Sequence, residues 1–264
     1  MPTSKSKTAK IISVTNQKGG VGKTTTTINL AAALSQLQKK VLIIDLDPQG
    51  NASTGLGVEV EDRELSTYEF LVEGVPLEKV TMETEISGLD IVPATIDLSS
   101  ADIDLISNEK RSYLLHAALR KKQQDKQKYD YILIDCPPSL NILTVNAMVA
   151  SHSVLIPLQS EFFALEGLSQ LLLTVKEVRQ TANENLRVEG IVLTMFDGRN
   201  NLSKQVEADA RSNLRELVFK TIIPRNVRVS EAPSYSMPVL TYDPSSKGSK
   251  AYMSLAKELL ANNS

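Results

Sequence analysis

The sequence predicts an α/β fold with a mostly parallel, twisted sheet flanked by helices. Three observations predict this class. Six short runs of aliphatic and β-branched residues are apolar at consecutive positions, as in strands that are buried on both faces. Segments with a helical spacing of apolar residues separate most of these runs, an alternation typical of layered α/β proteins. Hydrophobic residues make up 42% of the 264 positions, which is enough for one sizeable core.

Each apolar run gives one expected strand. We expect strands at 10–15, 40–45, 89–94, 129–135, 153–158 and 189–195. Apolar residues three or four positions apart predict helices at 24–38, 111–124, 141–150, 164–182 and 203–218, and a last helix in KGSKAYMSLAKELLA, 247–261. KKQQDKQK, 121–128, is expected to be a helix end and a solvated turn. No repeat or linker interrupts the pattern, so we expect a short flexible tail, 1–9, and a single domain, 10–264.

The composition excludes several kinds of site. Cys136 is the single cysteine, so no intramolecular disulfide can form, and with His116 and His152 it cannot build a Cys/His zinc site. A bound metal must therefore have oxygen ligands. No run of about 18 uncharged apolar residues occurs, and the start MPTSKSKTAK lacks the apolar stretch of a secretory signal. We therefore expect a cytoplasmic protein with no membrane partner.

Charge is distributed unevenly along the chain, although the net charge is only −2. Residues 59–110 carry 14 acidic and 3 basic side chains, whereas residues 199–228 carry 3 acidic and 7 basic ones. The first segment would repel a polyanion and the second could hold it.

The stretch NQKGGVGKTTTTINL, 16–30, lies between the first expected strand and the first expected helix, which is the context of a phosphate-binding loop. Gly19, Gly20 and Gly22 let backbone N–H groups converge on phosphate oxygens at the positive end of the helix. Lys23 can then reach the β- and γ-phosphates, and the Thr24 hydroxyl can bind Mg²⁺.

This loop is a variant of the strict pattern G-x-x-x-x-G-K-[ST]. Gln17 occupies the first glycine position of that pattern. A phosphate cradle needs one lysine at its helix end, so the second lysine, Lys18, needs a separate explanation.

Two further aspartates end apolar strands, Asp45 in IIDLDPQGN and Asp135 in ILIDCPPS. Ligands of open α/β sheets bind at the carboxyl ends of the strands, so we expect both carboxylates near the phosphates. Asp135 is expected to hold Mg²⁺ directly or through its water. Asp47 is a second candidate beside Asp45, because spacing alone does not separate their roles. With no well-placed histidine base, positioning and electrostatics should carry a slow hydrolysis.

With its two lysines, KGGVGKTT resembles the loop of the deviant Walker ATPases, a family that includes ParA, MinD and the nitrogenase iron protein. The resemblance implies a P-loop NTPase fold of the deviant Walker A type. It implies that Lys18 crosses a dimer interface to the phosphates of the partner's ATP, so that two subunits sandwich two ATP molecules. The catalytic residues would be Lys18, Lys23 and Asp45. Asp45 would be the family's switch I aspartate, which positions or polarises the attacking water. The metal ligands would be Thr24 and Asp135. The ATP-binding residues of the loop would be Lys18, Gly19, Gly20, Val21, Gly22, Lys23, Thr24 and Thr25.

Longer stretches are similar to the ParA/Soj type of chromosome-partitioning ATPase, from about residue 9 to the end. They are DLDPQGNAS (45–53), DCPPSL (135–140), EFFALEGLSQL (161–171), LTMFDGRNNL (193–202) and IPRNVRVSEAPS (223–234). The similarity implies that Pro224 and Asn226 contact adenine. It also implies that Arg199 and Arg228 contact DNA, for which Lys204, Arg211 and Arg215 are weaker candidates.

This resemblance also implies the partners. The ATP-bound homodimer would bind double-stranded DNA without sequence preference, and doubling the basic surface would raise its avidity. A ParB/Spo0J-type centromere-binding protein would stimulate hydrolysis and so release the DNA. The location would be the nucleoid.

The alternative is a MinD-like membrane-associated positioning ATPase. It would need a basic amphipathic C-terminal anchor, whereas SLAKELLANNS has one lysine, one glutamate and a polar end. A nitrogenase-type electron donor would need more cysteines than Cys136. A metabolic synthetase with the same loop would not explain the basic segment.

Overall fold

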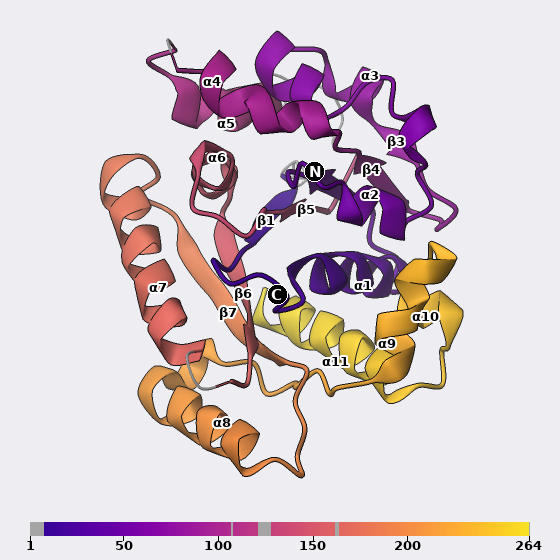
Figure 1. Cartoon of the computed structure of the whole chain (residues 1–264), viewed down its shortest axis with the longest axis vertical. Coiled ribbons are helices and arrows are strands. Elements are labelled where there is room, and N and C mark those ends of the chain that lie inside the picture. Colours follow the sequence, from indigo (N-terminus) through magenta and orange to yellow (C-terminus); the bar gives the residue numbers. More distant parts are fainter. Residues whose placement is uncertain (1–7, 107, 121–127, 162–163, 264) are drawn as a thin grey trace, which may run out of the picture.

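The computed structural model describes residues 8–106, 108–120, 128–161 and 164–263. Within these residues, a seven-stranded sheet has the strand order β3-β4-β2-β5-β1-β6-β7 (Figure 1). Only the pairing of β3 with β4 is antiparallel. The predicted α/β class with a mostly parallel sheet is confirmed. The strands are β1 (Lys10–Val14), β2 (Val41–Asp45), β3 (Met82–Glu83), β4 (Leu89–Val92), β5 (Tyr131–Asp135), β6 (Ser153–Gln159) and β7 (Arg187–Thr194).

All six expected strands are present, and β3 is the addition. It has two residues at the edge of the sheet, which is too short to show a period in the sequence. The α-helices are α1 (Lys23–Gln36), α2 (Asn51–Gly55), α3 (Leu77–Val80), α4 (Ala101–Asp104), α5 (Leu114–Arg120), α6 (Ile142–Ala150), α7 (Ala164–Thr181), α8 (Asn201–Leu214), α9 (Val227–Glu231), α10 (Val239–Tyr242) and α11 (Lys247–Asn262).

The short helices α2, α3, α4, α9 and α10 were not expected, because four or five residues cannot display a helical period. Single 3₁₀ or π turns cover Val60–Asp62, Glu69–Glu73, Ile96–Ser100, Arg111–Tyr113, Arg215–Leu217 and Ala232–Tyr235. Positions 121–127 and the tail at 1–7, for which a solvated turn and a flexible start were expected, lie outside the described residues.

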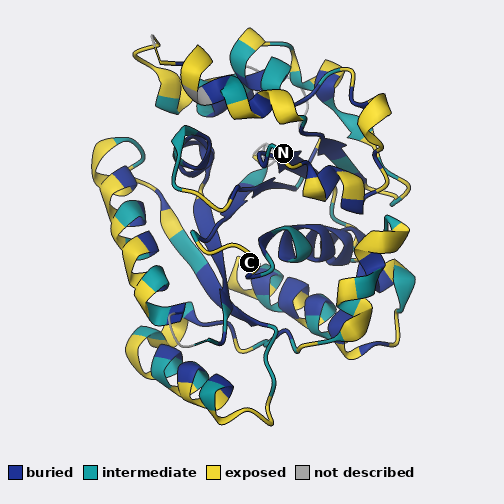
Figure 2. Cartoon of the chain, in the orientation of Figure 1, coloured by how far each residue is buried: buried dark blue, intermediate teal, exposed yellow. Residues whose placement is uncertain are grey.

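Helices cover both faces of the sheet (Figure 1). In β2, Val41 and Ile43 pack in the cluster formed with α1 and α11, whereas Leu42 and Ile44 pack in the cluster formed with α5 and α6. This alternation is the period of two that a strand imposes on its side chains. Because β2 is covered on both faces, its apolar run is continuous, and Figure 2 shows the central strands and α1 as almost wholly buried.

The parallel register sets the carboxyl ends of three strands level. Val14 of β1 and Asp45 of β2 are both paired with Asp135 of β5. The loops that follow these strands therefore leave the sheet at one edge, where ligands of open α/β sheets bind. No helix in the described part of the chain is long and apolar enough to cross a membrane.

Candidate nucleotide-binding site

The glycine-rich loop at 15–22 connects β1 to α1. Gly20 and Gly22 have φ angles of +75° and +85°, a left-handed conformation that other L-residues adopt at a cost. Gly22 occupies the N-cap position of α1 and no side chain caps the helix there. The first N–H groups of α1 are therefore available to an anion at the positive end of the helix dipole.

Lys23 lies across this loop. Its ammonium group donates a hydrogen bond of 3.0 Å to the carbonyl oxygen of Lys18, and only 6% of the residue is exposed. Burial lowers the pKa of Lys23, while the neighbouring carboxylate of Asp135 acts in the opposite direction. A buried cation at the helix end is suited to a phosphate group, which would supply the missing counter-charge.

A cavity of about 490 Å³ opens over the loop. Among the predicted residues, those that line it are Gly19, Gly20, Gly22, Lys23, Thr24 and Thr25. Val21, also in the loop, is not among the described residues that line the cavity: it is buried, and its carbonyl oxygen accepts a hydrogen bond of 2.8 Å from the Thr194 hydroxyl. The other lining residues are Ile28, Asn29, Asp47, Gln49, Asn51, Thr54, Gly55, Pro138, Met195, Pro233 and Met237.

Asp45 and Asp47 have different environments. Both carboxylate oxygens of Asp45 are occupied inside the fold: they accept hydrogen bonds from the backbone N–H groups of Asp47 and Ser53 and from the Ser53 hydroxyl. Asp45 is fully buried and is not among the described residues that line the cavity, whereas Asp47 is. Of the two candidates that the sequence left open, the geometry favours Asp47 as the carboxylate that faces a nucleotide.

Asp135 is buried beside the loop with one free oxygen. Its Oδ1 accepts a hydrogen bond of 2.8 Å from the Thr27 hydroxyl, and its Oδ2 has no hydrogen-bond partner among the described residues. Burial raises the pKa of Asp135, and the nearby carboxylate of Asp45 raises it further. A buried carboxylate oxygen without a donor fits a site for a hard cation, which would supply the missing positive charge.

The side chain of Lys18 pairs with a carboxylate of its own chain. Lys18 is not among the described residues that line the cavity, and its side chain, 43% exposed, forms an ion pair with Glu161 just after β6. The prediction that Lys18 reaches the nucleotide of a second subunit stays a prediction. An exposed ion pair of this kind contributes little to stability, so it can exchange for another partner.

Pro224 and Asn226 are not among the described residues that line the cavity. Pro224 pairs with Phe196 in an isolated bridge, and the Asn226 side chain caps α9 by accepting a hydrogen bond of 3.3 Å from the Val229 N–H. Their proposed contact with adenine stays a prediction. Met195, Pro233 and Met237 line the cavity instead, and sequence reasoning missed all three. Met195 directly follows β7, so the rule that ligands bind at strand ends could have found it.

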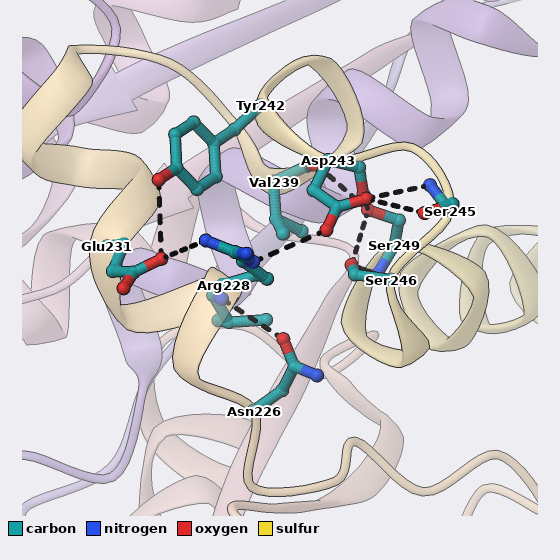
Figure 3. A network of polar contacts seen from close by, with 10 residues as sticks. Asn226, Arg228, Glu231, Val239, Tyr242, Asp243, Ser245, Ser246 and Ser249 are labelled. Atoms are coloured by element: carbon teal, nitrogen blue, oxygen red, sulfur yellow. Dashed lines mark hydrogen bonds and ion pairs between the residues drawn. The ribbon is translucent and has the colours of Figure 1, made fainter.

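The two candidate DNA-binding arginines are paired with carboxylates of their own chain. Arg199, whose side chain is 92% exposed, donates two hydrogen bonds to Asp197, of 3.0 and 2.9 Å. Arg228 donates one of 2.9 Å to Glu231 and lies 3.5 Å from an oxygen of Asp243 (Figure 3). The weaker candidates differ from one another: Lys204 and Arg215 are exposed, whereas Arg211 pairs with Glu207.

A strand, a glycine-rich loop with a buried lysine and a helix N-terminus, all opening on one cavity, define a nucleotide-binding protein of the P-loop class. Known proteins agree with this class. A family model described as an AAA domain matches residues 9–188. The sporulation initiation inhibitor protein Soj of Bacillus subtilis is 52% identical over 96% of this chain and 99% of its own length. The chromosome partitioning protein ParA of Caulobacter vibrioides is 51% identical over 96% of this chain and 94% of its own.

The chain belongs to the ParA/Soj family of chromosome-partitioning proteins, and the resemblance found in the sequence is confirmed. Among solved structures, cobyrinic acid a,c-diamide synthase from Mycobacterium smegmatis with a bound ATP analogue and magnesium superposes with a TM-score of 0.82. It is 36% identical and covers 96% of this chain and 95% of that one. The predicted P-loop NTPase fold is thereby confirmed.

Proposed function

We propose that this chain is a DNA-partitioning ATPase in which bound ATP joins two copies and hydrolysis separates them. The observation that carries the proposal is the difference between the environments of two lysines in the loop. Lys23 is buried over its own phosphate loop, whereas Lys18 is exposed, pairs with Glu161 and is not among the described residues that line the cavity. A cation that serves no site in its own subunit is free to serve the site of another.

The loop and its neighbours supply what ATP needs. Backbone N–H groups at the start of α1 would bind the phosphates with Lys23, and Thr24 and Asp135 would hold Mg²⁺. When bound, Mg²⁺ neutralises charge on the β- and γ-phosphates. Asp47 would orient a water whose oxygen bonds to the γ-phosphorus. The bond from that phosphorus to the bridging oxygen breaks, ADP keeps the electron pair, and the water's proton leaves with phosphate or solvent.

Dimerisation would complete the catalytic site. Lys18 would exchange Glu161 for the phosphates of the partner's ATP, where a preplaced cation stabilises the charge that develops during transfer. The ion pair that it leaves is exposed on both sides, so breaking it costs little, of the order of 1 kcal/mol or less.

The basic segment at 199–228 would hold the DNA. Its 7 basic side chains outnumber 3 acidic ones, and Arg199, Lys204, Arg225 and Arg228 are all exposed. Contacts of this kind bind phosphates rather than bases, so binding should be independent of sequence and weaken with salt. Two copies of the segment in one dimer would bind with an avidity that either copy lacks.

We infer the cellular setting from the family. A centromere-binding protein of the ParB/Spo0J type would stimulate hydrolysis and release DNA, and the protein would be cytoplasmic and associated with the nucleoid. The MinD-like alternative finds no support in the last helix. Tyr252, Leu255 and Leu259 of α11 are buried in the core with α1, so this apolar face has no surface to offer a membrane.

DNA retention tests the proposal. Wild-type protein with Mg²⁺ and a non-hydrolysable ATP analogue should be retained on unrelated DNA sequences alike, and released by ADP or by about 0.5 M salt. Arg228→Ala should dimerise with the analogue yet lose most retention, whereas Arg179→Ala, an exposed arginine at the end of α7, should behave as wild type. Retention that is the same with ADP and with the analogue would refute the ATP switch.

A further inference from the structure

Arg63 is a buried cation that the proposed function has not used. It comes from the acidic stretch at 59–110, but only 7% of it is exposed. Its four hydrogen bonds within the described residues all go to neutral oxygens: two to the carbonyl of Val58, one to the carbonyl of Ala94 and one to the Thr54 hydroxyl. Burying a guanidinium group is costly, so such a residue calls for a reason.

The guanidinium group packs against the turn that carries Asp47. Gly50, which ends this turn with a φ of +61°, donates a hydrogen bond of 2.8 Å to the carbonyl oxygen of Asp47. A Cβ atom on Gly50 would lie 2.3 Å from Nη1 of Arg63, so glycine is needed there for close approach as well as for conformation. Arg63 therefore lies directly behind the segment from which Asp47, Gln49 and Thr54 face the cavity.

The same side chain ties that segment to the sheet. Nη2 donates to Thr54 at 2.8 Å, and Nη1 donates to the carbonyl of Ala94, just beyond β4, at 3.0 Å. The N–H of Ala94 in turn donates to the hydroxyl of Ser53, which also binds Asp45. The planar fork of arginine can span Val58, Thr54 and Ala94 at once, which the single ammonium of lysine cannot do.

We propose that Arg63 is a positioning residue for hydrolysis, which fixes the 47–54 segment against β4 so that Asp47 keeps its place beside the γ-phosphate. The inference rests on the proposed function. Arg63 is not among the described residues that line the cavity, and the predicted phosphate loop at 15–22 follows a different strand, β1. Loss of Arg63 should therefore slow hydrolysis and leave nucleotide affinity almost unchanged, since small misplacements at a reacting centre cost rate.

The test compares Arg63→Lys with wild type and with Arg179→Lys, the same change at an exposed position on α7. Each protein is measured for melting temperature, for affinity toward a non-hydrolysable ATP analogue, and for single-turnover hydrolysis of saturating ATP. We expect Arg63→Lys to hydrolyse ATP about 10-fold or more slowly, with an analogue affinity within about 3-fold of wild type. Arg179→Lys should match wild type in all three.

A second variant removes only the hydrogen bond between Arg63 and Thr54. Thr54→Val removes the acceptor of the Nη2 bond while keeping a similar shape, and it should slow hydrolysis in the same way. Combined with Arg63→Lys it should add little, because both changes break one linkage. If Arg63→Lys does not fold, Thr54→Val alone decides the question.

Three results would overturn the inference: a folded Arg63→Lys that hydrolyses ATP at the wild-type rate, a Thr54→Val that does so, or an affinity that falls in step with the rate. The last would mean that Arg63 supports nucleotide binding or the whole site rather than the position of Asp47. Absence of hydrolysis in wild type would instead refute the proposed function, and the inference with it.

Discussion

The phosphate loop and the arginine-bearing segments differ in how far they are prepared for a ligand. In the loop, the glycine conformations, the buried Lys23 and the free start of α1 already form a cradle. Around Arg199 and Arg228, by contrast, the positive charges are paired with carboxylates of the same chain. The first region is already arranged for a phosphate, whereas the second would have to exchange partners before it could hold DNA. Mutations near the phosphate loop and mutations near the two arginines should therefore have effects of different size.

The largest effect is expected in the prepared region, at the carboxylate facing the cavity. Asp47→Asn keeps the shape and can still accept the hydrogen bond that Asp47 receives from Gln49, but it loses the charge. Hydrolysis should fall by roughly 10²-fold while the ATP-bound dimer persists, as measured by single-turnover assays and light scattering.

Asp45→Asn is the matched comparison. Its carboxylate is buried and fully bonded, so the NH2 group of the amide would leave either the N–H of Asp47 or the donors of Ser53 unsatisfied. It should lower the free energy of unfolding by about 1–3 kcal/mol. If Asp45→Asn abolished hydrolysis without lowering the melting temperature, and Asp47→Asn did not, the assignment of Asp47 would be wrong.

A smaller effect is expected where the arginines must exchange partners. Arg199 holds the pKa of Asp197 at about 2, as expected of a carboxylate with a cationic partner. Asp197→Asn frees Arg199 for phosphate and should raise the affinity of the ATP-bound dimer for DNA by about 2- to 5-fold, since exposed pairs contribute little. Asp209→Asn, on the neighbouring α8, removes the same charge without touching Arg199 and serves as the control. Equal effects of the two variants would show that only net charge matters.

The smallest expected effect is a change in stability with pH, and it concerns a histidine at the end of the sheet far from the cavity. Nδ1 of His152 accepts a hydrogen bond of 2.9 Å from the N–H of Ile11, which requires the neutral ring. Partial burial and the charges of Lys10 and Arg120 lower the pKa of His152. The unfolded chain therefore binds a proton on this histidine more readily than the folded protein does. The stabilisation that neutral His152 provides is complete above the ordinary histidine pKa, and it is lost as the pH falls through the lower pKa of the folded state.

Denaturant unfolding at pH 7 and pH 5 measures this contribution. Because the ring is partly exposed, the loss should be only about 0.5 kcal/mol. His152→Gln should show a smaller loss between the two pH values than wild type, whereas His116→Gln should keep the contribution of His152. An unchanged pH dependence in His152→Gln would contradict the assignment.

How much the sequence could predict depends on how local each feature is. Continuous apolar runs and glycines act over a few residues, so the strands and the phosphate loop were predictable. Some ionic partners are distant in the sequence: Lys18 meets Glu161 and Arg228 meets Asp243 only through the fold. The difference between Asp45 and Asp47 likewise depends on Ser53 and on the position of the cavity, neither of which spacing reveals. Arg63 gave no signal at all, because its partners are mainly backbone oxygens.

The most direct test of the proposed switch is the molar mass of the protein in solution with Mg²⁺ and a non-hydrolysable ATP analogue, measured over a range of concentrations. We predict that wild type doubles its mass with the analogue and remains monomeric with ADP. Lys18→Ala should bind the analogue through Lys23 yet stay monomeric, while Glu161→Gln, which frees Lys18 from its ion pair, should still dimerise. Wild-type protein that stays monomeric at every concentration, or Lys18→Ala that dimerises like wild type, would contradict the proposed exchange of Lys18 between subunits.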